Sequence, residues 1–129
     1  MENDLKEMSL LVVDDSAINQ RVVMMSLKNM LGKIEAANDG LEAYRKFCEN
    51  HYDIVVMDGR MPVMDGYEST RKIRAYEKEN SNEKPAMIIA LTGSDTDEEA
   101  ETCLEAGMNV CMLKPFRLNQ FLEILKDFN

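Results

Sequence analysis

The sequence predicts an α/β fold in which helices cover both faces of one parallel β-sheet. Five short apolar runs alternate with five segments whose apolar residues recur at helical spacing. Strands and helices that alternate in this way form a parallel sheet with right-handed crossovers. Four of the five runs end at polar or charged residues. Because parallel strands place their carboxyl ends at one edge, we expect a functional site there.

Length and charge restrict the class of protein. The 129 residues have the usual size of one domain, so we expect a single domain over residues 1–129. The net charge of −9 disfavours direct binding of nucleic acid or anionic membranes. No apolar run approaches the length of a membrane span, and no signal region is visible at the start. Three cysteines without CxxC spacing predict reduced thiols and a cytoplasmic protein.

The first expected strand covers residues 8–13, and Asp14 and Asp15 follow it directly. A helix is predicted over residues 17–31, because apolar residues recur with a period of 3.6 and Gly32 would end it. Its predicted inward residues are Ile18, Val22 and Met25, with Val23, Leu27 and Met30 beside them.

Residues 33–37 alternate in polarity and predict an edge strand. Asp39, followed three residues later by Glu42, has the spacing of a helix-starting capping box. The inward residues of that helix are expected to be Tyr44, Phe47 and Cys48. His51, the only histidine, lies at a helix-to-strand connection without a nearby nucleophile, so we interpret it as a solvated loop residue.

The third expected strand covers residues 54–57 and runs into Asp58. Taken alone, Asp58 fits an ordinary strand end as well as it fits a functional acid. A loop rich in Gly and Pro then leads to Asp65 and Glu68, a second capping pair. The next helix should direct Ile73 and Tyr76 inward and end in the charged stretch 77–84.

The last two strands are predicted over residues 87–91 and 110–113, which end at Thr92 and Lys114. Thr96 should cap the helix between them, near whose end Gly107 lies. The expected inward residues of the last two helices are Ala100, Cys103, Leu104 and Met108, and then Leu118, Phe121, Leu122, Leu125 and Phe128. The whole pattern predicts a three-layer (βα)5, flavodoxin-like, doubly wound sheet with strand order 2-1-3-4-5.

The predicted fold gathers Asp14, Asp15, Asp58, Thr92 and Lys114 at one edge of the sheet. Two carboxylates about 4 Å apart repel by roughly 4 kcal/mol at a surface-like dielectric constant, so the three acids require a cation. Mg2+ prefers carboxylate oxygens together with waters and phosphate oxygens. The sequence therefore predicts a magnesium site.

Two other activities of such folds fit less well. Flavin binding needs a phosphate cradle after the first strand, where Asp14 and Asp15 would repel phosphate. A phosphatase with an aspartate nucleophile would need a second acid two residues after Asp58, where Arg60 stands. A metal-assisted carboxylate nucleophile that accepts a phosphoryl group remains.

These residues resemble those of the receiver domains of two-component response regulators, and the resemblance covers nearly the whole chain. The run Met-Pro-Val-Met-Asp-Gly over residues 61–66 is similar to the loop after the phospho-acceptor, especially in receivers of hybrid sensor kinases and phosphorelays. The resemblance implies that Asp14 and Asp15 bind the metal, that Asp58 is phosphorylated, that Thr92 is the hydroxyl switch residue and that Lys114 is the conserved lysine of the site.

The resemblance has two further implications and one exception. It implies that the Arg60 backbone carbonyl is a metal ligand and that the bond between Lys114 and Pro115 is cis. Receivers usually carry Tyr or Phe at the position of Cys111, an aromatic residue that turns inward on activation. Without it, we expect Thr92 to move without an aromatic partner, or the loop after it to carry the signal.

By this resemblance, Asp58 takes a phosphoryl group from a histidine kinase or a histidine phosphotransfer protein, with Mg2+ as cofactor. The labile product would make the domain a timed switch of an output domain or protein rather than a turnover enzyme. An interaction module independent of phosphorylation is the alternative, weakly favoured by Cys111. A metal-dependent phosphohydrolase is a third possibility, but the sequence offers no evident second acid–base residue.

Overall fold

The computed structural model describes residues 5–80 and 84–127 and confirms the predicted sheet. Five parallel strands lie in the order β2-β1-β3-β4-β5. The strands are β1 (Ser9–Val13), β2 (Lys33–Ala37), β3 (Ile54–Asp58), β4 (Met87–Thr92) and β5 (Val110–Leu113). The helices are α2 (Ala17–Leu27), α3 (Gly40–Glu49), α4 (Gly66–Glu79), α5 (Asp97–Ala106) and α6 (Leu118–Asp127). Within the described ranges, no helix is long and apolar enough to cross a membrane.

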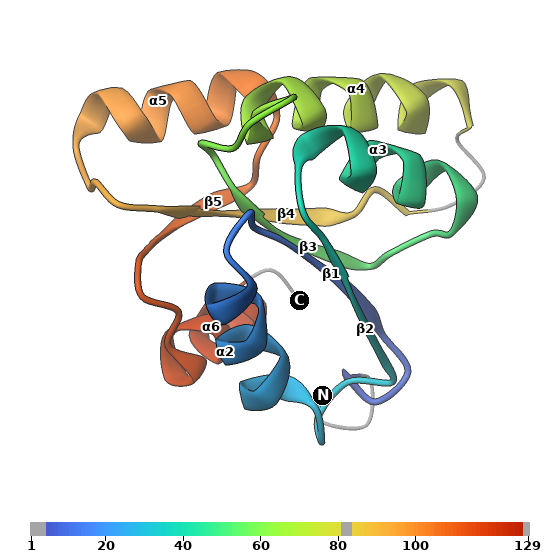
Figure 1. Ribbon diagram of the computed structural model, residues 1–129, viewed down its shortest axis with the longest axis vertical. Helices are drawn as coiled ribbons and strands as arrows, with labels where there is room; N and C mark the ends of the chain where they lie inside the picture. Colours follow the sequence, from blue (N-terminus) through green and yellow to red (C-terminus); the bar gives the residue numbers. More distant parts are fainter. Residues whose placement is uncertain (1–4, 81–83, 128–129) are drawn as a thin grey trace.

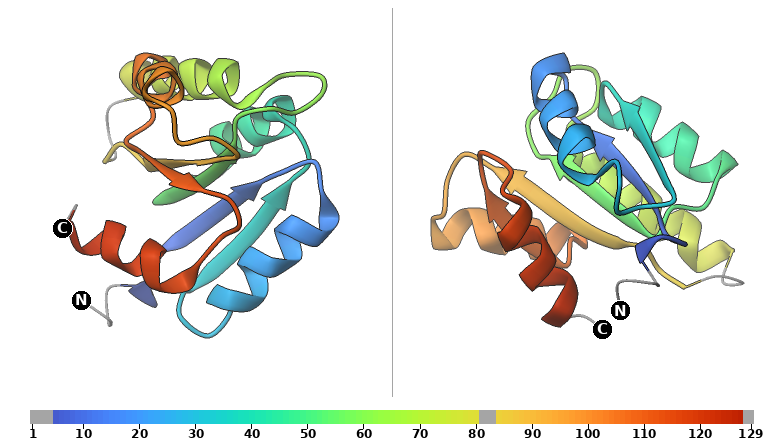
Figure 2. Two further views of the ribbon diagram at one scale, coloured as in Figure 1. Left: turned by 90° about the vertical axis from the view of Figure 1, so that its left-hand side faces the viewer. Right: turned by 90° about the horizontal axis from the view of Figure 1, so that it is seen from below.

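The helices form two layers, one on each face of the sheet (Figure 1). Helices α3, α4 and α5 cover one face, and α2 and α6 cover the other; the two further views in Figure 2 show the same separation. Successive side chains of a strand point to opposite faces, so Leu11 and Val13 belong to one core and Leu10 and Val12 to the other. Burial on both faces explains why the central strands are continuous apolar runs.

The register of the strands brings their carboxyl ends together. Val13 of β1 is level with Met57 of β3, Asp58 is level with Leu91 of β4, and Thr92 is level with Leu113 of β5. The residues that follow these strands therefore share one edge of the sheet.

The three predicted caps are confirmed. Asp39 Oδ1 accepts a hydrogen bond from Glu42 N at 2.8 Å and so starts α3. Asp65 and Thr96 start α4 and α5 through the same kind of bond, at 2.8 and 3.2 Å. Gly107 ends α5 with φ = 107°, a left-handed conformation that favours glycine.

For the first helix, the predicted end is wrong and the predicted buried face is right in part. Helix α2 ends at Leu27 instead of residue 31, because Gly32 N donates to Met8 O at 3.0 Å and so brings the chain back to pair with β1. Only one of the two predicted stripes faces the sheet: Val23 and Leu27 are buried, as predicted. The expected inward residues Ile18, Val22 and Met25 are 76%, 43% and 63% exposed. Two apolar stripes lie side by side on this helix, and only one can contact the sheet.

Other helices show smaller departures. In α5, Cys103 and Met108 beyond it are buried as expected, whereas Leu104 is 61% exposed and Ala100 is exposed. Phe47 of α3 is buried, and Tyr44 and Cys48 are half-buried. In α6, Phe121 and Leu125 are buried and Leu118 and Leu122 are half-buried; the predicted inward Phe128 and part of the charged stretch 77–84 lie outside the described residues.

Candidate functional site

The structure brings the three predicted acids together. Carboxylate oxygens of Asp14, Asp15 and Asp58 lie within 4.8 Å of one another, with Asp15 exposed and the other two buried. Asp14 and Asp15 follow β1, and Asp58 is the last residue of the neighbouring strand β3. These acids lie close together because β1 and β3 are paired so that Val13 is level with Met57, and the residues that follow these two meet at one edge.

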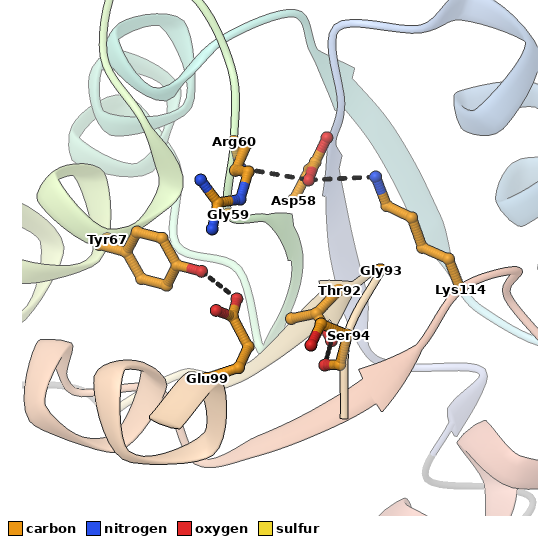
Figure 3. A pocket seen from close by; sticks show the side chains of 9 residues that line it. All are labelled: Asp58, Gly59, Arg60, Tyr67, Thr92, Gly93, Ser94, Glu99 and Lys114. Carbon is orange, nitrogen blue, oxygen red and sulfur yellow. Dashed lines mark hydrogen bonds and ion pairs between the residues drawn. The ribbon is translucent and has the colours of Figure 1, made fainter. Parts of the chain in front are cut away.

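The Asp58 carboxylate points toward a single cationic side chain in the view of the pocket (Figure 3). Its side chain is 7% exposed, and Oδ1 lies 3.2 Å from Lys114 Nζ. The same oxygen accepts a hydrogen bond from Arg60 N at 3.3 Å. Lys114 follows β5 and reaches across the end of β4 to Asp58. Asp58 and Lys114 therefore form an ion pair across the end of β4.

Asp14 is the least satisfied of the three acids. Its Oδ1 accepts a hydrogen bond from Ser16 N at 2.9 Å. Its Oδ2 is buried and has no hydrogen-bond partner among the described residues. Burial is the main cause that raises the pKa of Asp14, and the charge of Asp58 adds to it. A buried carboxylate oxygen without a donor, beside two more carboxylates, fits a divalent cation.

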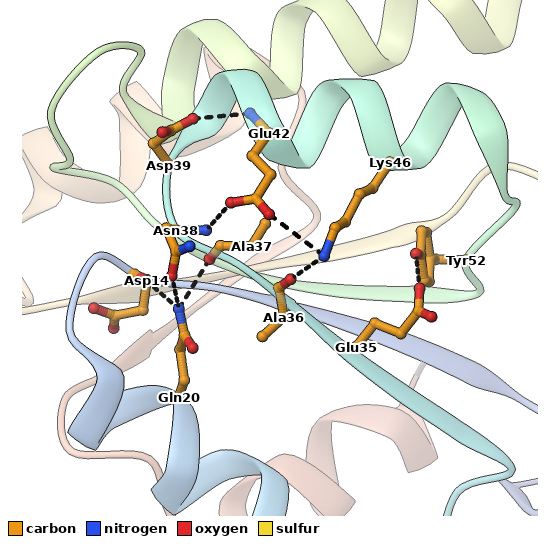
Figure 4. A network of polar contacts seen from close by, with 10 residues as sticks. All are labelled: Asp14, Gln20, Glu35, Ala36, Ala37, Asn38, Asp39, Glu42, Lys46 and Tyr52. Atoms are coloured by element: carbon orange, nitrogen blue, oxygen red, sulfur yellow. Dashed lines mark hydrogen bonds and ion pairs between the residues drawn. The ribbon is translucent and has the colours of Figure 1, made fainter.

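A network around Gln20 fixes the position of Asp14 (Figure 4). Gln20 Nε2 donates to Asp14 O at 2.7 Å, to Ala37 O at 3.2 Å and to Asn38 Oδ1 at 2.9 Å. Asn38 N in turn donates to Glu42 Oε1 at 2.7 Å. Gln20 thus ties the end of β1 to the end of β2, and the acid pair sits on a supported backbone.

The remaining predicted residues occupy the expected places. Thr92 ends β4, is buried, and donates from Oγ1 to Ser94 O at 2.9 Å. The bond between Lys114 and Pro115 is cis, as the resemblance implied. Cys111 of β5 is half-buried, packs against the core beneath α5 and does not line the site pocket.

A pocket of about 210 Å³ opens beside Asp58 (Figure 3). Its walls include two residues that the sequence analysis did not assign to the site, Tyr67 and Glu99. Glu99 stands three residues after the predicted cap Thr96, and Tyr67 is the first residue after the loop rich in Gly and Pro. The sequence offered one signal for each: Tyr67 directly follows Gly66, and Glu99 lies in the first turn of the helix that follows Thr92.

The structure also tests the predictions about the cysteines and about His51. The three cysteines carry free thiols, as expected. His51 precedes β3 at the opposite edge of the sheet from Asp58 and is half-buried rather than solvated. Its Nε2 lies 3.7 Å from Asp53 Oδ1, and its ring meets that of Phe47 edge-on at 6.0 Å.

This chain is similar to known proteins in sequence and in structure. The model of the family described as the response regulator receiver domain matches residues 10–126. Sensor histidine kinase RcsC of Escherichia coli is 37% identical over 123 residues, which cover 95% of this chain and 12% of that kinase. The chain therefore spans a small fraction of the length of this curated relative.

Solved structures agree with the sequence match. The receiver domain of Ssk1 from Saccharomyces cerevisiae, crystallised with the histidine phosphotransfer protein Ypd1, has a TM-score of 0.89 at 27% identity and covers 95% of this chain and 89% of that one. The receiver of sensor histidine kinase PA1611 from Pseudomonas aeruginosa, with magnesium in its active-site cleft, has a TM-score of 0.79 at 38% identity and covers 94% and 96%. The chain belongs to the response regulator receiver domain family.

Proposed function

We propose that this receiver accepts a phosphoryl group on Asp58 from a phosphohistidine. The observation that carries the proposal is the buried Asp58 carboxylate at the end of β3, with the Lys114 ammonium at 3.2 Å and two more carboxylates within 4.8 Å. Phosphoryl transfer requires a positioned nucleophile and positive charge on the transferring oxygens. This edge of the sheet supplies the nucleophile and one of the cations.

Asp58, Lys114 and Thr92 have separate roles in phosphoryl transfer. In the described chain both polar contacts of Asp58 are made by Oδ1, so Oδ2 is the atom for attack on phosphorus. As the bond from Oδ2 to phosphorus forms, the bond from phosphorus to the donor imidazole breaks, and the imidazole takes up a proton. Lys114 pairs with one phosphoryl oxygen. Thr92 leaves Ser94 O and donates to another.

The cation site completes this set. Asp14, Asp15 and Asp58 would hold a Mg2+ ion, with the Arg60 carbonyl as a further ligand. Such an ion supplies positive charge to the carboxylates and to a phosphoryl oxygen. The acyl phosphate is labile, so the domain is a timed cytoplasmic switch and not a turnover enzyme. It acts on an output domain or protein through surfaces near the site.

The protein donor docks on the exposed stripe of α2 in this proposal. Ile18, Val22 and Met25 share one face of the helix, which begins two residues after Asp15. Exposed large apolar side chains that cluster beside a site mark a protein interface. A helical histidine phosphotransfer domain that covers this stripe would present its phosphohistidine to Asp58.

Transfer from two donors tests the proposal. Radiolabelled phospho-Ypd1 is the protein donor, acetyl phosphate is the small donor, and both are used with Mg2+. We expect Ile18→Glu and Met25→Glu to slow transfer from the protein donor at least about tenfold, because a charge is buried in an apolar contact. Neither variant should change the rate with acetyl phosphate.

Leu104→Glu is the matched control, because Leu104 is also exposed but lies on α5, in the opposite helix layer. Equal loss in this control would remove the docking surface from the proposal. A wild-type chain that accepts no phosphoryl group from either donor would remove the proposal itself.

A further inference from the structure

Two side chains of the phosphorylation pocket have no part in the roles above, and they contact each other. The hydroxyl of Tyr67, in the first turn of α4, donates a hydrogen bond to Glu99 Oε1, in the first turn of α5. Both residues line the pocket together with Asp58, Arg60 and Lys114 (Figure 3). The bond therefore joins two helices inside the space beside Asp58.

Tyr67 is held against the residue that follows the phospho-acceptor. A Cβ on Gly59 would lie 2.6 Å from the Tyr67 hydroxyl oxygen, so only glycine leaves room for the phenol. The ring packs against the core beneath α3, α4 and α5. Burial, and then the hydrogen bond and charge of Glu99, raise the pKa of Tyr67, so the phenol stays neutral and remains a donor.

Glu99 brings a negative charge to the pocket. Among the residues that line the pocket, Asp58 and Glu99 carry negative charge and Arg60 and Lys114 carry positive charge. Phosphorylation replaces the single charge of Asp58 by an acyl phosphate with roughly two negative charges. The added negative charge repels the Glu99 carboxylate, and this repulsion is strong in a partly buried pocket.

The end of α5 is joined to the middle of α4 by a different contact. Arg74 Nε of α4 donates to Gly107 O, at the end of α5, at 2.9 Å. This contact lies away from the pocket, so a charge on Asp58 does not oppose it. The first turn of α5 can therefore move while its end stays attached, and Gly93 before that turn has open space around it.

We propose that Glu99 is a positioning residue that opposes entry of the phosphoryl group, and that phosphorylation of Asp58 breaks its hydrogen bond with Tyr67. The first turn of α5 is then released. This inference rests on the proposed role of Asp58. Because linkage is reciprocal, a variant that removes the opposition must bind the phosphoryl group, or an analogue of it, more tightly.

The affinity for beryllofluoride in the presence of Mg2+ tests this inference. We expect Glu99→Gln to bind the analogue about tenfold more tightly than the wild type. Glu98→Gln is the matched control, because Glu98 is exposed on the same helix turn and loses the same charge. It should change the affinity less than about twofold.

Tyr67→Phe provides the second arm. It should also tighten binding, since Glu99 is no longer held in the pocket, but it should add little in the Glu99→Gln background, because coupled residues are not additive. In the wild type, the 13Cζ resonance of Tyr67 should shift on addition of beryllofluoride as its hydrogen bond is lost.

Each contrary outcome is informative. Equal effects of Glu99→Gln and Glu98→Gln would show that only net charge matters, and weaker binding by Glu99→Gln would reverse the assigned role. An unchanged Tyr67 resonance in a saturated wild type would show that the hydrogen bond persists. A wild type that binds no beryllofluoride and accepts no phosphoryl group from acetyl phosphate would instead contradict the proposed function.

Discussion

The charged groups at the two edges of the sheet differ in how well they are paired. At the amino edge, where the strands begin, the Arg74 guanidinium donates four hydrogen bonds: to Gly107 O at 2.9 Å, Glu77 Oε1 at 2.7 Å, Ala86 O at 2.9 Å and Asn109 Oδ1 at 2.8 Å. At the carboxyl edge, three carboxylates crowd together and Asp14 Oδ2 is buried without a partner among the described residues.

This difference indicates that the amino edge stabilises the fold and that the carboxyl edge is arranged to bind a ligand. A satisfied, partly buried network contributes stability, whereas crowded acids reduce stability until a cation binds. Functional sites often keep such unfavourable arrangements, which the rest of the fold must offset. Substitutions at the two edges should therefore change the free energy of unfolding in opposite directions.

The largest expected change is at the amino edge. Arg74→Ala should lower the free energy of unfolding by about 3 kcal/mol, because Glu77 loses its cation and the carbonyls of Ala86 and Gly107 lose their donor. Arg71→Ala, at an exposed position of the same helix, should change it by less than about 0.5 kcal/mol. Urea unfolding of both variants measures this, and similar losses would mean that the Arg74 network adds little.

The carboxyl edge should respond in the other direction. Without Mg2+, Asp14→Asn should raise the free energy of unfolding by about 1 to 2 kcal/mol at neutral pH, because it relieves repulsion and the burial of a charge. With Mg2+ present, the wild type should recover the difference by binding the ion in its native state only. Thermal unfolding with and without Mg2+ decides this; an unchanged wild type would argue against a cation site.

The gain in Asp14→Asn should depend on pH. Burial raises the pKa of Asp14 in the folded state above its ordinary value of 3.8. The wild type therefore loses stability as the pH rises through the folded-state pKa, and this loss is absent below the unfolded value. The advantage of Asp14→Asn should be complete at neutral pH and vanish as the pH falls toward 3.8. An advantage that is constant with pH would have another cause.

The smallest effect is expected on β5. Cys111 stands where receivers usually carry an aromatic residue, and a thiol is too small to fill space that Thr92 leaves. We predict that beryllofluoride with Mg2+ shifts the amide resonances of Thr92 and residues 93–96 but changes those of residues 110–112 little. Comparable shifts in both segments would show that this strand switches without an aromatic side chain.

Local patterns were enough to predict the strands, the caps and the residues at the end of each strand. Asp39 and Asp65 were recognisable as caps because the hydrogen bond they make spans only three residues. The sheet order followed from general rules of chain connection. The convergence of Asp58 and Lys114 was predictable because parallel strands end at one edge.

What the sequence could not predict depends on contacts between distant segments. The buried face of α2 was ambiguous, because Val22 and Val23 belong to adjacent apolar stripes and only packing selects one. The Arg74 network and the bond between Tyr67 and Glu99 join residues about 30 positions apart, which no local period reveals. Polar contacts of this kind require the fold before they can be recognised.

The location of the phosphoryl group tests the central claim most directly. The chain is incubated with acetyl phosphate and Mg2+, reduced with borohydride to mark the acyl phosphate, and digested for mass spectrometry. We predict that the mark lies on Asp58 alone and that Asp58→Asn, which is nearly isosteric, stays folded and unmarked. A mark on another acid, its persistence in Asp58→Asn, or an unmodified wild type would contradict the account.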